Sequence, residues 1–163
     1  MANPMYVYIQ PSEDIWRPGS LLVPRDFPHL ERHLGRFAHY MADRMAEEVV
    51  NAINDQRYRD RWVPLSVPYL DYKRRKGLSL RIWEATGTLK NSIRAYRSGS
   101  TWVVGVSQRL YYPGTDIKIY RIARYMEYGT DKMPARPLFY RVARRMSRDI
   151  SLHWARYRKE VGV

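Results

Sequence analysis

The histidines and glutamates are the residues of this chain whose types and spacing could support metal binding or catalysis. His29 and His33 are four residues apart, so on one helix they would share a face and could hold a metal ion. The residues between them lack the glutamate placement of a zinc protease. Glu47 and Glu48 are adjacent and would point in different directions on a helix, which suits paired acid–base work poorly. We therefore expect surface or half-buried histidines and no metal site.

Other catalytic signatures are absent from the sequence. The chain has no cysteine, which excludes disulfides, thiol nucleophiles and thiolate metal sites. It contains no glycine-rich phosphate-binding loop and no Gly-x-Ser-x-Gly motif. We expect a protein that is not an enzyme and that uses no cofactor.

The positive charge is the strongest compositional signal for a partner. The formal net charge is +13, which suits nucleic acid, an anionic surface or an acidic protein. No recognised DNA- or RNA-binding motif is present, and arginines also serve well in protein interfaces, so both kinds of partner stay open. The expected basic surface has two parts: Lys73, Arg74, Arg75 and Lys76 in "KRRKG", and Arg141, Arg145 and Arg148 on one flank of a later helix.

Hydrophobic spacing predicts two long helices with short strands between them. A stripe from Leu30 to Ile53, with Asp26 as N-cap, predicts a long amphipathic helix. Residues 92–107 alternate in the manner of a β-hairpin. The other expected elements are a short helix near 68–76 ended by Gly77, a helical turn at 86–93 capped by Thr86 or Thr88, a helix over 119–128, and a last helix from Pro137 to about Tyr157.

These elements indicate one α+β domain over residues 26–163, with a small antiparallel sheet packed against a long N-terminal helix and a C-terminal helix. Residues 1–25 contain four prolines and several apolar side chains, which predicts an extended arm with a short strand at 6–9. This arm docks either on its own domain or on a neighbouring subunit, with Tyr6, Tyr8 and Trp16 as contact candidates. No stretch approaches a membrane span and no secretory signal is visible, so we expect a soluble protein.

The stretch "ARYMEYGTDKMPARPLF" at 123–139 predicts a rigid elbow between two helices. Gly129 can end the first helix in a left-handed conformation. Pro134 and Pro137 hold the next residues extended, and Pro137 suits the first turn of the second helix. The elbow is either purely structural or an outward-facing contact ridge for a partner subunit. The candidates for that ridge are Glu127, Tyr128, Asp131 and Arg136, with Glu127 and Asp131 as the nearest partners for Arg136.

The ordered motifs of the chain resemble those of the tail-completion or head–tail joining proteins of tailed bacteriophages, also called minor tail or virion morphogenesis proteins. The resemblance covers about residues 27–158 and leaves out the arm. Leu138 precedes Phe139 where that family often has phenylalanine then leucine, and "QRLYYPGTDIKIY" is longer than in the family. The matching residues are Trp62, Pro64 and Leu65; Thr86, Gly87, Leu89, Ser92 and Ile93; Glu127, Tyr128, Gly129 and Thr130; and Pro134, Ala135, Arg136 and Pro137.

The resemblance implies a structural role in the virion neck or tail, with no catalytic residues. Copies of the chain would form a closed ring, with six expected and twelve possible, through which genomic DNA passes. The implied partners are portal or adaptor, tail terminator and tail tube proteins, and the chain would lie in host cytoplasm only during assembly. We expect the basic residues to face protein rather than DNA, because a strongly basic lumen would retard DNA. The alternative is a basic nucleic-acid-binding protein that acts through sequence-independent phosphate contacts.

Overall fold

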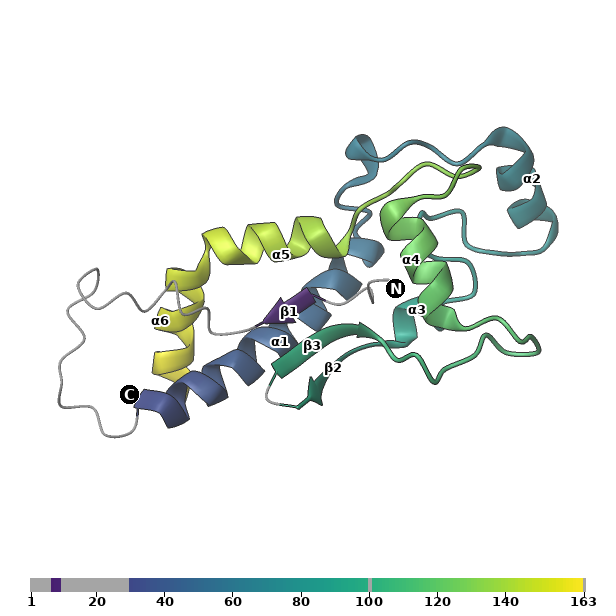
Figure 1. Cartoon of the computed structure of the whole chain (residues 1–163). Coiled ribbons are helices and arrows are strands. Elements are labelled where there is room, and N and C mark those ends of the chain that lie inside the picture. The colour runs from purple at the N-terminus through teal and green to yellow at the C-terminus, as the bar shows by residue number, and fades with distance from the viewer. Residues whose placement is uncertain (1–6, 10–29, 100, 163) are drawn as a thin grey trace.

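The computed structural model describes the backbone of residues 7–9, 30–99 and 101–162, and the side chains of 33–99 and 101–162. Its helices and strands confirm the expected α+β class, with a small antiparallel sheet packed against a long N-terminal helix, and helices at the C-terminal end (Figure 1). The elements are β1 (Val7–Ile9), α1 (Leu30–Asn54), the 3-10 helix η2 (Arg59–Arg61), α2 (Val67–Arg75), α3 (Thr88–Asn91), β2 (Ile93–Ser98), β3 (Thr101–Val106), α4 (Ile119–Tyr128), α5 (Phe139–Arg148) and α6 (Ile150–Val161).

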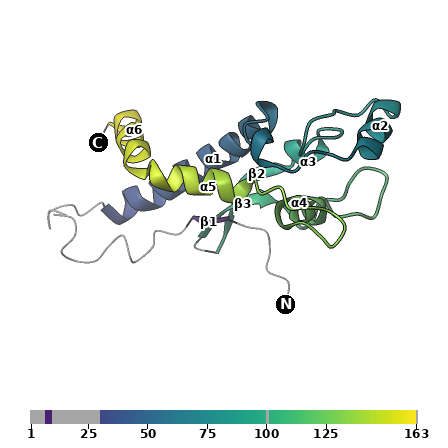
Figure 2. The same cartoon turned by 90° about the horizontal axis from the view of Figure 1, so that it is seen from above.

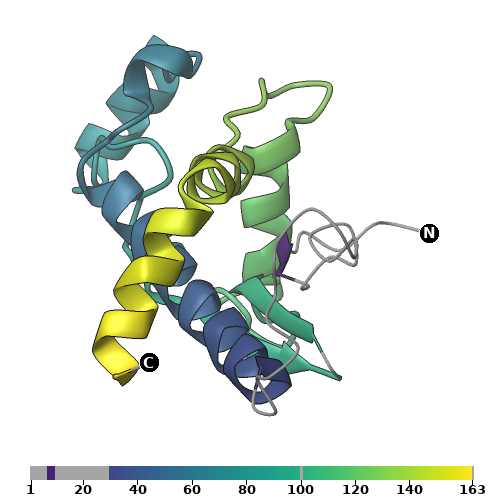
Figure 3. The ribbon, with the colours of Figure 1, turned by 90° about the vertical axis from the view of Figure 1, so that its left-hand side faces the viewer.

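Helix α1 is the central element of the core. Its apolar side chains recur every three or four residues and therefore share one stripe. Met45, Val49 and Ile53 of this stripe are fully buried. In Figures 1 and 3, α5 and α6 lie on one side of α1 and the β2–β3 hairpin on the other. The spacing that predicts this helix from sequence is therefore the spacing that builds the core.

The sheet has the strand order β1-β3-β2, and both pairs are antiparallel. β2 and β3 form the predicted hairpin, with Ile93 opposite Val106 at one end and Ser98 opposite Thr101 at the turn. Strand β1 pairs with the other edge of β3, where Val7 lies opposite Val104 and Ile9 opposite Trp102. The expected strand at 6–9 thus occurs at 7–9, on the chain's own sheet.

The C-terminal segment differs from the single helix expected between Pro137 and about Tyr157. Helix α5 ends at Arg148, Asp149 has φ −97° and ψ 16°, and α6 begins at Ile150. The break redirects the chain, and α6 runs steeply away from α5 (Figures 1 and 2). Trp154 and Tyr157 of α6 thereby pack on Phe37 of α1, with ring centroids 4.9 and 5.4 Å apart. Aromatic packing on α1 outweighs the continuation of a straight helix.

The short elements between the long helices lie where the sequence places them, with one correction at a cap. α2 is followed by Gly77 at φ +63°, as expected for a helix stop. α3 has Gly87 as its N-cap, without a side-chain capping bond, so neither Thr86 nor Thr88 caps it. The predicted Asp26 cap lies outside the described residues. Within the described ranges, no helix has the length and apolar character needed to cross a membrane.

Candidate functional site: the elbow and its surroundings

The elbow begins where α4 ends. The amide of Gly129 donates to the carbonyl of Tyr125 at 2.8 Å, and Gly129 has φ +77° and ψ −179°. The positive φ is as expected, but ψ lies far from the left-handed helical value, in a region that is essentially restricted to glycine. A Cβ at this position would lie 2.8 Å from the nitrogen of Ala135 and 2.8 Å from the carbonyl oxygen of Met133. Backbone conformation and close approach therefore both require glycine here.

The carboxylate of Glu127 caps the helix on the other side of the elbow. One of its oxygens accepts the amides of Leu138 at 2.7 Å and Phe139 at 3.1 Å, and the other accepts that of Tyr140 at 3.0 Å. These amides open α5 and have no partner within the helix. A negative charge there also opposes the positive end of the helix dipole. Glu127 therefore fixes the start of α5 from the end of α4.

The surroundings of Glu127 shift its titration. The residue is only 4% exposed. Burial raises the pKa of the Glu127 carboxyl above its ordinary value, and the three amide donors offset part of that rise because they favour the ionised form. Glu127 was expected on an outward-facing ridge. That prediction is wrong, because the carboxylate is used inside the fold.

Arg136 is the second buried charge of the elbow. It is 4% exposed, and its guanidinium donates to the carbonyls of Val63 at 2.8 Å and Pro64 at 3.1 Å. Its own amide donates to the carbonyl of Met126 at 2.7 Å. Arg136 thus joins the elbow to the segment before α2, more than seventy residues earlier in the chain.

These contacts correct two predictions, namely that Arg136 lies on an outward-facing ridge and that it pairs with Glu127 or Asp131. Glu127 is fully occupied by the amides of α5, and the cation that favours the ionised form of its carboxyl is Arg141 rather than Arg136. Asp131 is exposed and makes no described bond to Arg136. The expected position of Pro137 is also wrong, because α5 begins at Phe139 and Pro137 precedes its N-cap. Pro137 fixes the approach to the helix rather than its first turn.

Two tryptophans complete the elbow from distant segments. The indole nitrogen of Trp62 donates to the carbonyl of Pro137 at 3.0 Å, and that of Trp83 donates to the carbonyl of Arg136 at 2.9 Å. Both rings are buried in the core. Trp62 belongs to the motifs predicted from sequence, whereas Trp83 was missed. The sequence signal for Trp83 was its position, because it lies three residues before Thr86, where a recognised motif begins.

Tyr128 and Asp131 are the candidates of the elbow that remain available to a partner. Tyr128 is 64% exposed, and Asp131 is exposed in the loop that follows it. Two further tyrosines, Tyr125 on α4 and Tyr140 on α5, are exposed beside them in sequence and were not predicted. Tyrosine combines a large contact area with a polar tip and is enriched at protein interfaces. The elbow therefore has a buried structural inside and a tyrosine-rich outside.

The predicted basic surface is only partly a surface. Lys73 is 2% exposed, and its ammonium donates to the carbonyls of Arg81 at 2.9 Å and Glu84 at 2.7 Å, so its assignment to the surface is wrong. Burial lowers the pKa of the Lys73 ammonium, and the Glu84 carboxylate opposes that shift. Arg74, Arg75 and Lys76 are exposed, and Arg74 pairs with Asp71 at 2.8 Å.

The arginines of α5 divide between two environments. Arg145 and Arg148 are exposed, and Arg145 lies 4.0 Å from Glu48 of α1. Arg141 is half-buried, with its guanidinium carbon 5.9 Å from the ring centroid of Tyr58. α5 contains no acidic residue, so its exposed side is cationic. Arg141 braces the core, while Arg145 and Arg148 fit the basic surface predicted for them.

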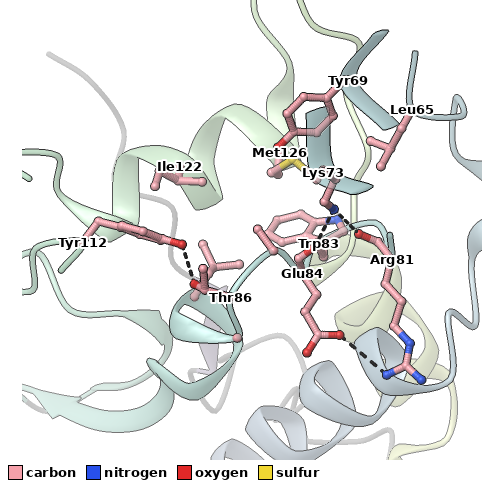
Figure 4. Close-up of a pocket in the computed structure, with 13 residues that line it drawn as sticks. Leu65, Tyr69, Lys73, Arg81, Trp83, Glu84, Thr86, Tyr112, Ile122 and Met126 are labelled. Atoms are coloured by element: carbon pink, nitrogen blue, oxygen red, sulfur yellow. Dashed lines mark hydrogen bonds and ion pairs between the residues drawn. The ribbon is translucent and has the colours of Figure 1, made fainter. Parts of the chain in front are cut away.

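An open apolar groove lies between α2 and α4, close to the elbow (Figure 4). Tyr69 and Leu65 line one side, Ile122 and Met126 of α4 line the other, and Trp83 forms the floor. Its volume is about 90 Å³. The hydroxyl groups of Thr86 and Tyr112 are hydrogen-bonded to each other at one end. The groove was not predicted, because its walls come from segments that only the tertiary fold brings together.

The remaining candidates belong to the arm. Tyr8 lies in β1, where its backbone is opposite Val103. Tyr6 and Trp16 lie outside the described residues, as does His29. Within the described side chains, no three histidine or acidic residues are grouped so that they could hold a metal ion.

Comparison of the chain with protein-family models, curated proteins and solved structures gave no significant match.

Proposed function

We propose that this chain is a non-enzymatic structural protein of a tailed-bacteriophage virion, a tail-completion or head–tail connector component whose copies form a ring in the neck. The proposal begins from the motif resemblance. The observation that carries it further is that the motif segments meet at one place. Trp62 and Pro64, from the first motif, bond to the elbow motif around Arg136 and Pro137.

The converging contacts make sense of an otherwise arbitrary set of residues. Each motif residue in the cluster satisfies a group that another motif supplies: Glu127 accepts the amides that follow the prolines, and Arg136 donates to the carbonyls beside Trp62. Such a cluster specifies a fold rather than a reaction, because its polar groups are consumed by one another. That is the expectation for a scaffold whose work is done by its surfaces.

The exposed surface also suits assembly better than chemistry. Tyr125, Tyr128 and Tyr140 project near the elbow, and arginines cover the outer side of α5. Tyrosine and arginine are the residue types enriched in protein interfaces. The formal charge of +13 would favour acidic neighbours in a ring and would also tolerate passing DNA.

Gene deletion and complementation test this proposal. Without the gene, host cells infected by the phage should accumulate DNA-filled heads and separate tails, and the wild-type gene supplied in trans should restore joined particles. A Tyr128→Ser variant should fold with unchanged melting and yet restore fewer joined particles, because the Tyr128 side chain is largely exposed. Normal particles from the deletion phage would refute the proposal.

Nucleic-acid binding through sequence-independent phosphate contacts is the second candidate function, favoured by the cationic side of α5. On that alternative the isolated protein would bind duplex DNA tightly enough to act outside the particle. Our proposal instead predicts weak, sequence-independent binding that falls steeply with salt. Filter binding at physiological ionic strength separates the two.

A further inference from the structure

The groove between α2 and α4 has the size and lining of a receptor for one apolar side chain. A cavity of about 150 Å³ lined by apolar groups holds a benzene ring. The groove is smaller, at about 90 Å³, and opens to solvent, so a branched aliphatic side chain fits it better than an indole. Trp83, Ile122 and Met126 would contact that side chain over most of its surface (Figure 4).

The rim of the groove is positively charged. Arg81 is exposed in the lining, and the exposed side chains of Arg74, Arg75 and Lys76 lie nearby at the end of α2, whereas Lys73 is buried. The nearby carboxylates are already engaged: Glu84 lies 2.7 Å from the Lys90 ammonium, and Asp71 pairs with Arg74. Cations therefore outnumber carboxylates around the opening. An occupant that combines an aliphatic side chain with adjacent acidic residues would match both features.

The chain contains one such segment in its own arm. Glu13 and Asp14 are followed directly by Ile15 and Trp16. Ile15 is a branched aliphatic residue of the size that the groove accepts. The other apolar run of the arm, Leu21 to Val23, has no acidic residue immediately before it. Charge and shape together thus favour Glu13–Trp16 over the rest of the arm.

The described elements that flank this segment in sequence point away from the groove of their own chain. β1 ends at Ile9, which lies opposite Trp102 near the hairpin turn, whereas α3 and the groove adjoin the other end of the hairpin. At its other side the segment joins α1 at Leu30. α1 is 25 residues long, about 36 Å at 1.5 Å per residue, and only its C-terminal end approaches the groove, where Asn54 bonds to Lys90.

Because β1 runs antiparallel to β3, the chain at Ile9 heads toward the hairpin turn and away from α3 and the groove. To reach its own groove, Ile15 would need the six residues after Ile9, which span about 20 Å at most, to reverse that direction. A neighbouring copy presents the same groove without that constraint. We propose that Ile15 of one copy occupies the α2–α4 groove of the next copy, with Glu13 and Asp14 facing the basic rim.

This inference rests on the self-assembly part of the proposed function and names the contact that links successive subunits. The contact is heterologous, since the arm of one copy meets the groove of another, and repeated contacts of this kind form a ring when the rotation between copies closes. An arm that reaches into the next subunit also explains why apolar residues accompany its four prolines. The ring would thus be joined by arms as well as by domain surfaces.

Cysteine trapping with the full-length chain tests the proposal, because the native chain has no cysteine. One preparation carries Ile15→Cys and a second, differently tagged, carries Ala85→Cys in the lining of the groove. They are mixed under mild oxidation, and mixed disulfides are quantified. Two control mixtures pair Leu22→Cys with Ala85→Cys, and Ile15→Cys with Ser147→Cys on the exposed side of α5.

The Ile15–Ala85 mixture should give about tenfold more mixed disulfide than either control, because docking raises the local concentration of the two thiols. Glu13→Lys with Asp14→Lys, or raised salt, should reduce the yield. Yields equal to the controls would overturn the proposal. So would an intramolecular disulfide in the doubly substituted chain at high dilution, which would place the arm in its own groove.

The trapping result and the virion result can fail separately. If the protein is trapped efficiently but is absent from phage particles, the proposed function is wrong and the proposed arm contact is supported. If the protein is present in particles but gives no mixed disulfide above the controls, only the proposed arm contact is wrong.

Discussion

Replacing Glu127 by alanine should destabilise the protein strongly, because its carboxylate is used inside the fold. The substitution removes the acceptor of three amides at the start of α5, spaced 2.7 to 3.1 Å from the carboxylate. Leu138 and Phe139, which carry two of those amides, are buried, so water cannot easily replace the carboxylate. Tyr140 is exposed, and its amide can be solvated.

The magnitude follows from these contacts. Loss of a helix cap costs about 0.5–2 kcal/mol. A buried donor left without a partner costs about 1–3 kcal/mol. Since the two costs overlap, we expect a loss of about 2–4 kcal/mol in the free energy of unfolding, which for a domain of this size lowers Tm by roughly 5–15 °C. Glu127→Gln keeps one acceptor oxygen and should lose about half as much.

Calorimetry and urea unfolding measure both variants against a surface control. Glu47→Ala removes a carboxylate of α1 that is 60% exposed and pairs with Arg44, so it should change stability by less than about 0.5 kcal/mol. A Glu127→Ala protein no less stable than Glu47→Ala would refute the capping role and with it the structural explanation of the elbow motif.

Three other substitutions test the same region and its charge pairs. Gly129→Ala should cost about 1–3 kcal/mol from the positive φ, plus the clash with the backbone of Ala135, whereas Gly35→Ala, which meets nothing within 4 Å, should be neutral or stabilising by thermal melting. Arg136→Met should cost about 1–3 kcal/mol in urea unfolding because the Val63 and Pro64 carbonyls lose a donor, and Arg136→Lys should recover part of this; equal loss in both would contradict the role of the planar guanidinium. Burial raises the pKa of the Glu84 carboxyl, but Lys90 and Arg81 more than offset this rise and hold that pKa below its ordinary value. The stability that the Glu84–Lys90 pair contributes is therefore present above the unfolded pKa of about 4.3, and it is lost as the pH falls through the folded pKa. Glu84→Gln should flatten this acid limb of the Tm–pH curve, and an unchanged limb would rule the pair out.

Much of the fold was predictable because it depends on local patterns. The stripe of α1 is set by residues three and four apart, and the hairpin by alternation around Gly99. Gly129 ends α4 because its own backbone demands glycine. Such features need only neighbours in sequence, so one sequence is enough to find them.

The elbow contacts were not predictable in the same way, because their partners are distant. Arg136 was predicted to pair with Glu127 because the two opposite charges are near each other in sequence. In the structure the Glu127 carboxylate instead accepts hydrogen bonds from the amides at the start of α5. Arg136 is left to carbonyls more than seventy residues away. Lys73 was placed on the surface by its basic neighbours, but its ammonium is bound by the carbonyls of Arg81 and Glu84 in the segment that follows α2. The bend at Asp149 depends on packing against Phe37, which local spacing does not encode.

Quantitative composition of purified phage particles tests the central claim most directly. Mass spectrometry of particles, calibrated with isotope-labelled peptides of this chain and of the major capsid protein, gives its copy number per virion. The account predicts a small, fixed number consistent with one ring of six or twelve copies, retained after high-salt washing. Absence of the chain from purified particles, with abundant chain in the infected cytoplasm, would contradict it.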